Sequence, residues 1–96
     1  MKVSNEWGVP NQFLLTEEGR GANGNFIKRE VFQSYDSIIA EVITWPDRVD
    51  VTLDEQFWDY SQTTGKYRNK FLGEDRKETE RKIKNGTYRL ANLNKG

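Results

Sequence analysis

The sequence contains neither cysteine nor histidine. The lack of cysteine excludes disulfide bonds, thiolate nucleophiles and zinc fingers. The lack of histidine excludes the Ser-His-Asp triad, the Cys-His dyad and histidine-ligated metal sites. Long apolar runs are also absent, and Met1–Trp7 lacks the apolar stretch of a secretory signal. We therefore expect a cytoplasmic protein that is not an enzyme and has no cofactor, no metal and no membrane contact.

Aromatic residues supply much of the apolar material in this chain of 96 residues. Only 34% of the residues are apolar, but three Trp, four Tyr and five Phe are among them. One aromatic side chain can bury about 150–250 Å², so we expect a small core built around aromatic rings. The length fits a single domain. We predict one domain over residues 1–96, in which residues 1–10 are extended at best and loosely ordered.

The 15 basic and 15 acidic residues are distributed unevenly along the chain. Residues 1–65 carry five basic and eleven acidic side chains, whereas residues 66–96 carry ten basic and four acidic ones. Such asymmetry can indicate a contact with nucleic acid or an acidic interaction surface. It can also arise from charged faces that keep a small domain in solution and attract each other within it.

Strand-like patterns occupy the first half of the chain. They cover residues 12–17, 26–32, 37–44 and 48–54. Residues 37–44 are apolar on both faces, which predicts a central strand. The last segment alternates, so we expect Val49, Val51 and Leu53 to point inward and Asp50 and Asp54 to point to solvent. Trp45-Pro46-Asp47 is typical of a turn.

A helical period begins near Trp58. The i, i+4, i+7, i+11 spacing of Tyr60, Thr64, Tyr67 and Phe71 predicts a helix over residues 61–72, packed on the sheet through Tyr67 and Phe71. Ser61 or Asp59 can cap the start of this helix, and Gly73 suits the left-handed position after its end.

A second helix is predicted over residues 75–84, with Asn85-Gly86 as its stop signal. It offers only Thr79 and Ile83 to a core, and a short closing strand follows over residues 87–93. The resulting order is β-β-β-β-α-α-β. We therefore predict an α+β fold, in which two helices cover one face of a mainly antiparallel sheet of four to five short strands.

Two other patterns resemble functional motifs but have simpler interpretations. Gly19–Gly24 matches G-x-G-x-x-G, yet strand-like residues flank it on both sides, so we interpret Gly19–Asn25 as a hairpin loop. The acidic residues between 50 and 59 lack the spacing of a calcium loop, and we interpret them as a solvated face.

The densest cluster of polar and basic residues lies at the start of the first predicted helix. It contains Ser61, Thr63, Thr64, Lys66, Arg68 and Lys70. A helix N-terminus presents free N–H groups and a partial positive charge, so it can hold an anion. Alternatively, Ser61 or Thr63 caps the helix and the neighbouring aromatic residues fill the core. The sequence leaves both interpretations open.

The second predicted helix is basic and has almost no apolar face. We expect Arg76, Lys77 and Arg81 to be free to reach a phosphate or an acidic protein patch. The competing explanation is intramolecular, with these cations facing Asp50 and Asp54. The pairs Glu78–Lys82 and Glu80–Lys84 have the i,i+4 spacing of helix-stabilising ion pairs and would neutralise part of the charge.

Two segments resemble a known group of proteins. They read F-x-S-Y-x-S-x-I-A over residues 32–40 and W-D-Y-S-x-T-T-x-K-Y over residues 58–67, and a third similar stretch runs from residue 78 to residue 88. The chain resembles, over residues 10–94, a family of small proteins encoded by tailed phages and prophages of Gram-positive bacteria. The resemblance implies a phage setting and a location in the host cell, but it carries over no catalytic residue.

These observations favour a non-enzymatic phage accessory protein that acts by binding. The leading hypothesis is an anti-defence or host-takeover inhibitor that blocks a host protein, with a host or phage protein as its partner. The alternative is a nucleic-acid-binding accessory protein that uses the basic C-terminal third. A small virion or assembly component is a third possibility. The predicted contact residues are Ser61, Thr63, Thr64, Lys66, Arg68, Lys70, Arg76, Lys77 and Arg81, and the sequence does not set the oligomeric state.

Overall fold

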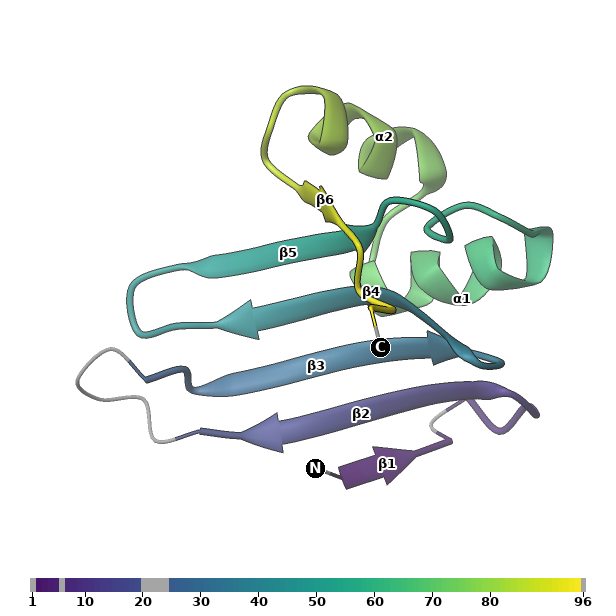
Figure 1. The fold of residues 1–96 in the computed structure, drawn as a ribbon, viewed down its shortest axis with the longest axis horizontal. Helices are drawn as coiled ribbons and strands as arrows, with labels where there is room; N and C mark the ends of the chain where they lie inside the picture. Colours follow the sequence, from purple (N-terminus) through teal and green to yellow (C-terminus); the bar gives the residue numbers. More distant parts are fainter. Residues whose placement is uncertain (1, 6, 20–24, 96) are drawn as a thin grey trace.

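The computed structural model describes residues 2–5, 7–19 and 25–95 of the chain (Figure 1). Within these ranges the fold is α+β, with a six-stranded, mostly antiparallel sheet and two helices. The elements are β1 (Lys2–Ser4), β2 (Gln12–Glu18), β3 (Lys28–Ser34), β4 (Ser37–Thr44), β5 (Val49–Asp54), α1 (Gln62–Leu72), α2 (Arg76–Lys84) and β6 (Arg89–Ala91). The predicted fold class is confirmed, whereas the prediction of four to five strands was too low.

The six strands lie in the sheet in the order in which they occur in the chain. All neighbours are antiparallel except β5 and β6, which pair in parallel through Leu53 and Leu90. Parallel neighbours require a crossover connection, and α1 and α2 form it. Strand β4 lies between β3 and β5, so the prediction of a central strand over residues 37–44 is confirmed.

Residues 2–5 and 7–10 of the N-terminal segment contact the rest of the fold. Strand β1 pairs with β2 through Val3 and Leu15. Further along, the rings of Trp7 and Phe32 meet edge to face with their centroids 5.5 Å apart, and Val9 packs against the same cluster. A three-residue strand is too short to show a period of two, so the sequence pattern did not reveal it.

The core lies between α1 and one face of the sheet, and Ile83 of α2 also packs against it. On that face Phe32 pairs across strands with Ala40, and Ala40 pairs with Leu53. All three side chains are fully buried. Tyr67 joins the cluster around Phe32, and Phe71 packs against both core clusters, so the predicted packing of α1 is confirmed. Both helices lie toward the end of the sheet where β3 passes into β4, and the opposite end extends beyond them (Figure 1).

The side chains of β5 differ in part from the expected alternation. Val51 and Leu53 point to the core as predicted, but Val49 is exposed because it lies at the extended end of the sheet. Asp54 was expected to face solvent and is instead buried. Its carboxylate accepts backbone hydrogen bonds from Phe57 and Leu93 at 2.8 Å each, so it joins the turn after β5 to the C-terminal segment.

Local signals set the helix ends as predicted. Gly73 ends α1 in the left-handed region with a φ of 71°, and Asp75 caps α2 by accepting from the backbone N–H of Glu78. Thr79 is fully buried and Ile83 packs against the core, as the sequence indicated. Within the described ranges, no helix is long and apolar enough to cross a membrane.

The glycine-rich segment Gly19–Asn25 lies largely outside the described residues, because residues 20–24 are not among them. Around it, the backbone N–H of Gly19 donates to the carbonyl oxygen of Ile27 at 2.8 Å. Strands β2 and β3 pair antiparallel from Gln12 opposite Ser34 to Glu18 opposite Lys28. The predicted hairpin is therefore confirmed, although nothing tests the interpretation of its loop.

Glu74, in the connection between the helices, anchors α2 to the chain that leads into β6. Its nearly buried carboxylate accepts from Thr79 Oγ1 at 2.6 Å, Lys82 Nζ at 2.7 Å and the Tyr88 hydroxyl at 2.9 Å. Burial by itself raises the pKa of Glu74, but the hydrogen bonds from Lys82, Thr79 and Tyr88 outweigh it. The pKa therefore lies below its ordinary value of 4.5.

We predict that the stabilisation from Glu74 is lost in acid. Because folding lowers the pKa of this carboxylate, its contribution is complete above pH 4.5 and declines as the pH falls through the lower, folded-state pKa. Glu74→Gln should therefore lower the melting temperature at pH 7, and the difference from wild type should shrink toward pH 3. Thermal denaturation followed by circular dichroism measures both curves. The exposed Glu55→Gln controls for the loss of one negative charge, and a Glu74→Gln difference that stays constant with pH would contradict the prediction.

Candidate functional site

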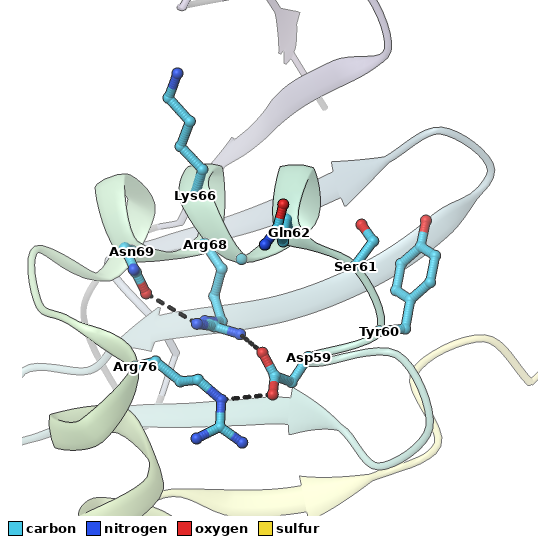
Figure 2. Close-up of a pocket in the computed structure, with 9 residues that line it drawn as sticks. Asp59, Tyr60, Ser61, Gln62, Lys66, Arg68, Asn69 and Arg76 are labelled. Atoms are coloured by element: carbon cyan, nitrogen blue, oxygen red, sulfur yellow. Dashed lines mark hydrogen bonds and ion pairs between the residues drawn. The ribbon is translucent and has the colours of Figure 1, made fainter.

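A groove beside α1 holds the candidate site (Figure 2). Its volume is about 600 Å³, within the range of ligand-binding pockets. We call it the α1 groove, and its lining residues are Asp59, Tyr60, Ser61, Gln62, Gly65, Lys66, Arg68, Asn69 and Arg76. One side of α1 forms one wall, the segment before the helix closes one end, and Arg76 of α2 lies across from the helix (Figure 2).

Hydrogen bonds of Ser61 and Thr64 fix the start of α1. Ser61 has an extended backbone, and its hydroxyl oxygen accepts from the backbone N–H of Thr64 at 3.1 Å, which identifies it as the N-cap. The Thr64 hydroxyl lies 2.9 Å from the hydroxyl of Ser34 in β3 and is fully buried. These contacts confirm the interpretation of Ser61 as the cap and attach the first turn of α1 to the sheet.

Arg68 forms the buried part of the groove wall and is only 1% exposed. Its Nη1 donates to the carbonyl oxygen of Trp58 at 2.7 Å and to Asp59 Oδ1 at 3.0 Å. Its Nη2 donates to Asn69 Oδ1 at 2.9 Å, while its buried Nε has no acceptor among the described residues. The guanidinium therefore ties the helix to the segment before it and leaves one donor unsatisfied.

Asp59 lies between two arginines. Arg68 binds one carboxylate oxygen, and Arg76 Nε donates to the other at 2.6 Å (Figure 2). Burial alone raises the pKa of Asp59, but the hydrogen bonds from Arg76 and Arg68 outweigh it, so the pKa lies below 3.8. The Trp58 ring contacts the same pair, with the guanidinium carbons of Arg68 and Arg76 at 5.2 and 5.5 Å from its centroid. These cation–π contacts help to hold both cations in place.

The groove unites four of the nine predicted contact residues, namely Ser61, Lys66, Arg68 and Arg76. Thr64 lies on the side of α1 that faces the sheet, where its hydroxyl bonds to Ser34, and it is fully buried away from the groove. The remaining four are exposed on α1 or α2 outside the groove lining: Thr63, Lys70, Lys77 and Arg81.

The expectation that Arg76 and Arg81 are free is wrong. Arg76 binds Asp59, and Arg81 makes two hydrogen bonds to the carboxylate of Glu78, at 2.8 and 2.7 Å. The intramolecular explanation holds for these two cations, but with different partners from those expected. Asp50 instead accepts from the Trp45 indole and from Arg48, and Asp54 binds backbone N–H groups.

Sequence reasoning did not assign Gln62, Gly65 and Asn69 to the site. Together with Lys66 they follow the i, i+3, i+4, i+7 spacing of one helix side, and this spacing was the available signal. Tyr60 was expected on the core face of the helix. It precedes the helix, is 46% exposed and meets Phe57 edge to face, because the N-cap at Ser61 starts the helix one residue later.

The arrangement is suited to binding an anion. Lys66, Arg68 and Arg76 contribute three positive charges, and Asp59 is the only acidic side chain in the groove lining. Among the described residues, no group of three or more Asp, Glu, His or Cys side chains could hold a metal ion. The excess of cations in the lining makes the groove chemically suited to a negatively charged group.

Comparison with known proteins identifies a family but no characterised relative. Residues 4–86 match the model of a family described as a family of unknown function, DUF8033. No curated protein matches the chain. No solved structure matches it either.

Proposed function

Because the chain belongs to this family of unknown function, DUF8033, we propose from its own geometry that it is a non-enzymatic binding protein. It recognises an anionic surface of a partner protein through the α1 groove. The observation that carries the proposal is that α1 and α2 place three cations in the lining of one recess, which holds a single carboxylate. The exposed Tyr60 at the rim adds an aromatic side chain of the kind enriched at protein interfaces.

Charge pairing favours a protein partner over nucleic acid. Each phosphate contact by a free Lys or Arg releases counterions, and non-specific binding to nucleic acid depends on many such contacts. Most cations between residues 66 and 84 already lie within 4.0 Å of an acidic side chain: Arg68, Arg76, Arg81, Lys82 and Lys84. In the described part of the chain, only Lys66, Lys70 and Lys77 in this stretch have no such partner. A surface with so few free cations is better suited to a local acidic patch.

The biological setting of this proposal rests on the sequence resemblance alone. In that setting the chain is a phage or prophage accessory protein in the cytoplasm of a Gram-positive host, where it blocks a host protein. Blocking requires only that the groove and its rim occupy the partner's surface, so no catalytic group is needed. Turnover of a nucleotide or peptide that disappears on mutation of one residue would overturn the non-enzymatic part of the proposal.

Affinity capture with a groove variant tests the proposal. Tagged wild type and a Lys66→Ala/Arg76→Ala variant are expressed in a Gram-positive host, and the captured proteins are identified by mass spectrometry with and without nuclease. Lys77→Ala/Lys84→Ala is the matched control, because it removes the same charge from exposed positions outside the groove lining. We expect a protein that wild type and control retain, that the groove variant loses, and that nuclease does not release.

Two results would reject this function. Equal retention by the groove variant and the control variant would show that the groove is not the contact surface. Capture that disappears with nuclease and falls steeply with salt would favour the nucleic-acid alternative instead. Melting temperatures of both variants establish that any loss of capture occurs in folded protein.

A further inference from the structure

Gly65 is an unusual residue for its place in the fold. It lies in the interior of α1, where glycine is less favourable than alanine, and it is buried in the groove wall. A Cβ atom added there would lie 3.6 Å from Arg68 Nη2 and 3.8 Å from Asp59 Oδ1, which are ordinary contact distances. Alanine would therefore fit, so close packing does not require glycine at this position. The missing side chain instead leaves the Arg68–Asp59 pair without a methyl group beside it in the groove wall.

Arg76 has donors left to bind a ligand. Its Nε–H donates to Asp59, and its Nη1 forms an ion pair with Glu80 at 3.6 Å that is longer than a hydrogen bond. Its Nη2 has no acceptor among the described residues. The side chain is half exposed and lines the groove. The planar terminal nitrogens of an arginine match the two oxygens of a carboxylate, which they bind side by side. Arg76 can thus keep its hydrogen bond to Asp59 while its terminal nitrogens donate to a second carboxylate.

We propose that the α1 groove accepts the carboxylate of an Asp or Glu side chain in an extended segment of the partner protein. Arg76 binds this carboxylate, and the absence of a side chain at Gly65 gives the segment access to the groove floor. The inference rests on the proposed function and names the group on the partner that the groove recognises.

A carboxylate suits this groove better than a phosphate does. The charge of Asp59 lies within bonding distance of Arg76, so a dianionic phosphate there would meet stronger repulsion than a singly charged carboxylate. The groove also offers amide side chains, Gln62 and Asn69, and Asn69 uses only its oxygen to hold Arg68. Its amide nitrogen can donate to the backbone carbonyl groups of an extended segment.

Titration with matched peptides tests whether the groove recognises a side-chain carboxylate. The probes are a capped (Gly-Glu)4 peptide and a capped (Gly-Gln)4 peptide, which differ only in charge, followed by inorganic phosphate and a short oligothymidylate. Backbone amide shifts in ¹⁵N-labelled protein report the site. We expect the Glu peptide to shift the amides of Gly65, Asn69 and Arg76, the Gln peptide to have little effect, and Arg76→Ala to weaken binding roughly tenfold or more.

Gly65→Ala separates stability from binding. Because the added methyl group fits and alanine favours the helix, the melting temperature should rise by about 4–8 °C. The same methyl group covers the Arg68–Asp59 pair, so affinity for the Glu peptide should fall several-fold. Thr63→Ala is the matched control, since it also improves helix propensity but lies at an exposed position of α1 outside the groove lining. It should leave peptide binding unchanged.

The remaining outcomes overturn the inference. They are equal binding of the Glu and Gln peptides, no binding of the Glu peptide at millimolar concentration, unchanged binding by Gly65→Ala, and tighter binding of phosphate or oligothymidylate. The two proposals can fail separately. If a captured protein is lost with Lys66→Ala/Arg76→Ala but retained by Gly65→Ala, the carboxylate site is rejected while the proposed function stands.

Discussion

Replacement of Arg68 by alanine is expected to destabilise the fold by at least about 3 kcal/mol, because it removes several hydrogen bonds from a buried charged group, each of which contributes about 1.5–3 kcal/mol. The guanidinium is 1% exposed and makes three hydrogen bonds, to Trp58, Asp59 and Asn69. Its removal leaves the Trp58 carbonyl without this donor and opens space beneath α1. For a domain of this size the melting temperature should fall by at least about 12 °C. Thermal and urea denaturation followed by circular dichroism measure the change.

Arg76→Ala is the matched control for Arg68→Ala. Both arginines bind Asp59 and both contact the Trp58 ring, but Arg76 is half exposed, so solvent screens its ion pair. Its removal should therefore have a much smaller effect. Arg68→Lys should not restore stability, because an ammonium group cannot reproduce the planar fork that reaches several acceptors at once. Equal losses from the two alanine variants would show that Arg68 is not the buried anchor of this segment.

Phe32→Ala is expected to lower the free energy of unfolding by about 3–5 kcal/mol, as for other fully buried aromatic residues. Phe32 is 0% exposed and lies between Trp7, with ring centroids 5.5 Å apart, and Phe71, at 5.9 Å. The deletion leaves a cavity at the point where the N-terminal segment, β3 and α1 meet. Urea denaturation at 25 °C gives the change, and the conservative Phe32→Leu provides a milder loss if the alanine variant does not fold.

Phe13→Ala tests the assignment of sheet faces. Leu14 is the cross-strand partner of Phe32, so its neighbour Phe13 points to the opposite face. Phe13 is only partly buried and belongs to neither core cluster, so its replacement should destabilise much less than that of Phe32. If Phe13→Ala cost as much, the core could not lie on a single face of the sheet.

The chain's helices were predictable because their signals are local. Ser61 and Gly73 bound α1, and Asp75 and Asn85 bound α2, and each acts on backbone groups within four residues. The central position of β4 was also predictable, because a short, nearly continuous apolar run indicates a strand inside a sheet and not at its edge. The ion pair between Arg81 and Glu78 was predictable as well, because the two residues are three positions apart on the same helix. Counting the net charge of the region did not reveal this pair.

Tertiary structure decided the short strands and the site. Strands β1 and β6 have three residues each, and partners elsewhere in the sheet determine them. The groove depends on Asp59 meeting Arg76 across 17 residues, and α2 is anchored by Glu74 and Tyr88, which are 14 residues apart. Composition could indicate that Arg68 and Arg76 are cations near a helix start, but not that one is buried and the other is exposed. Burial depends on which face of α1 meets the sheet, and that contact forms only when distant segments pack together.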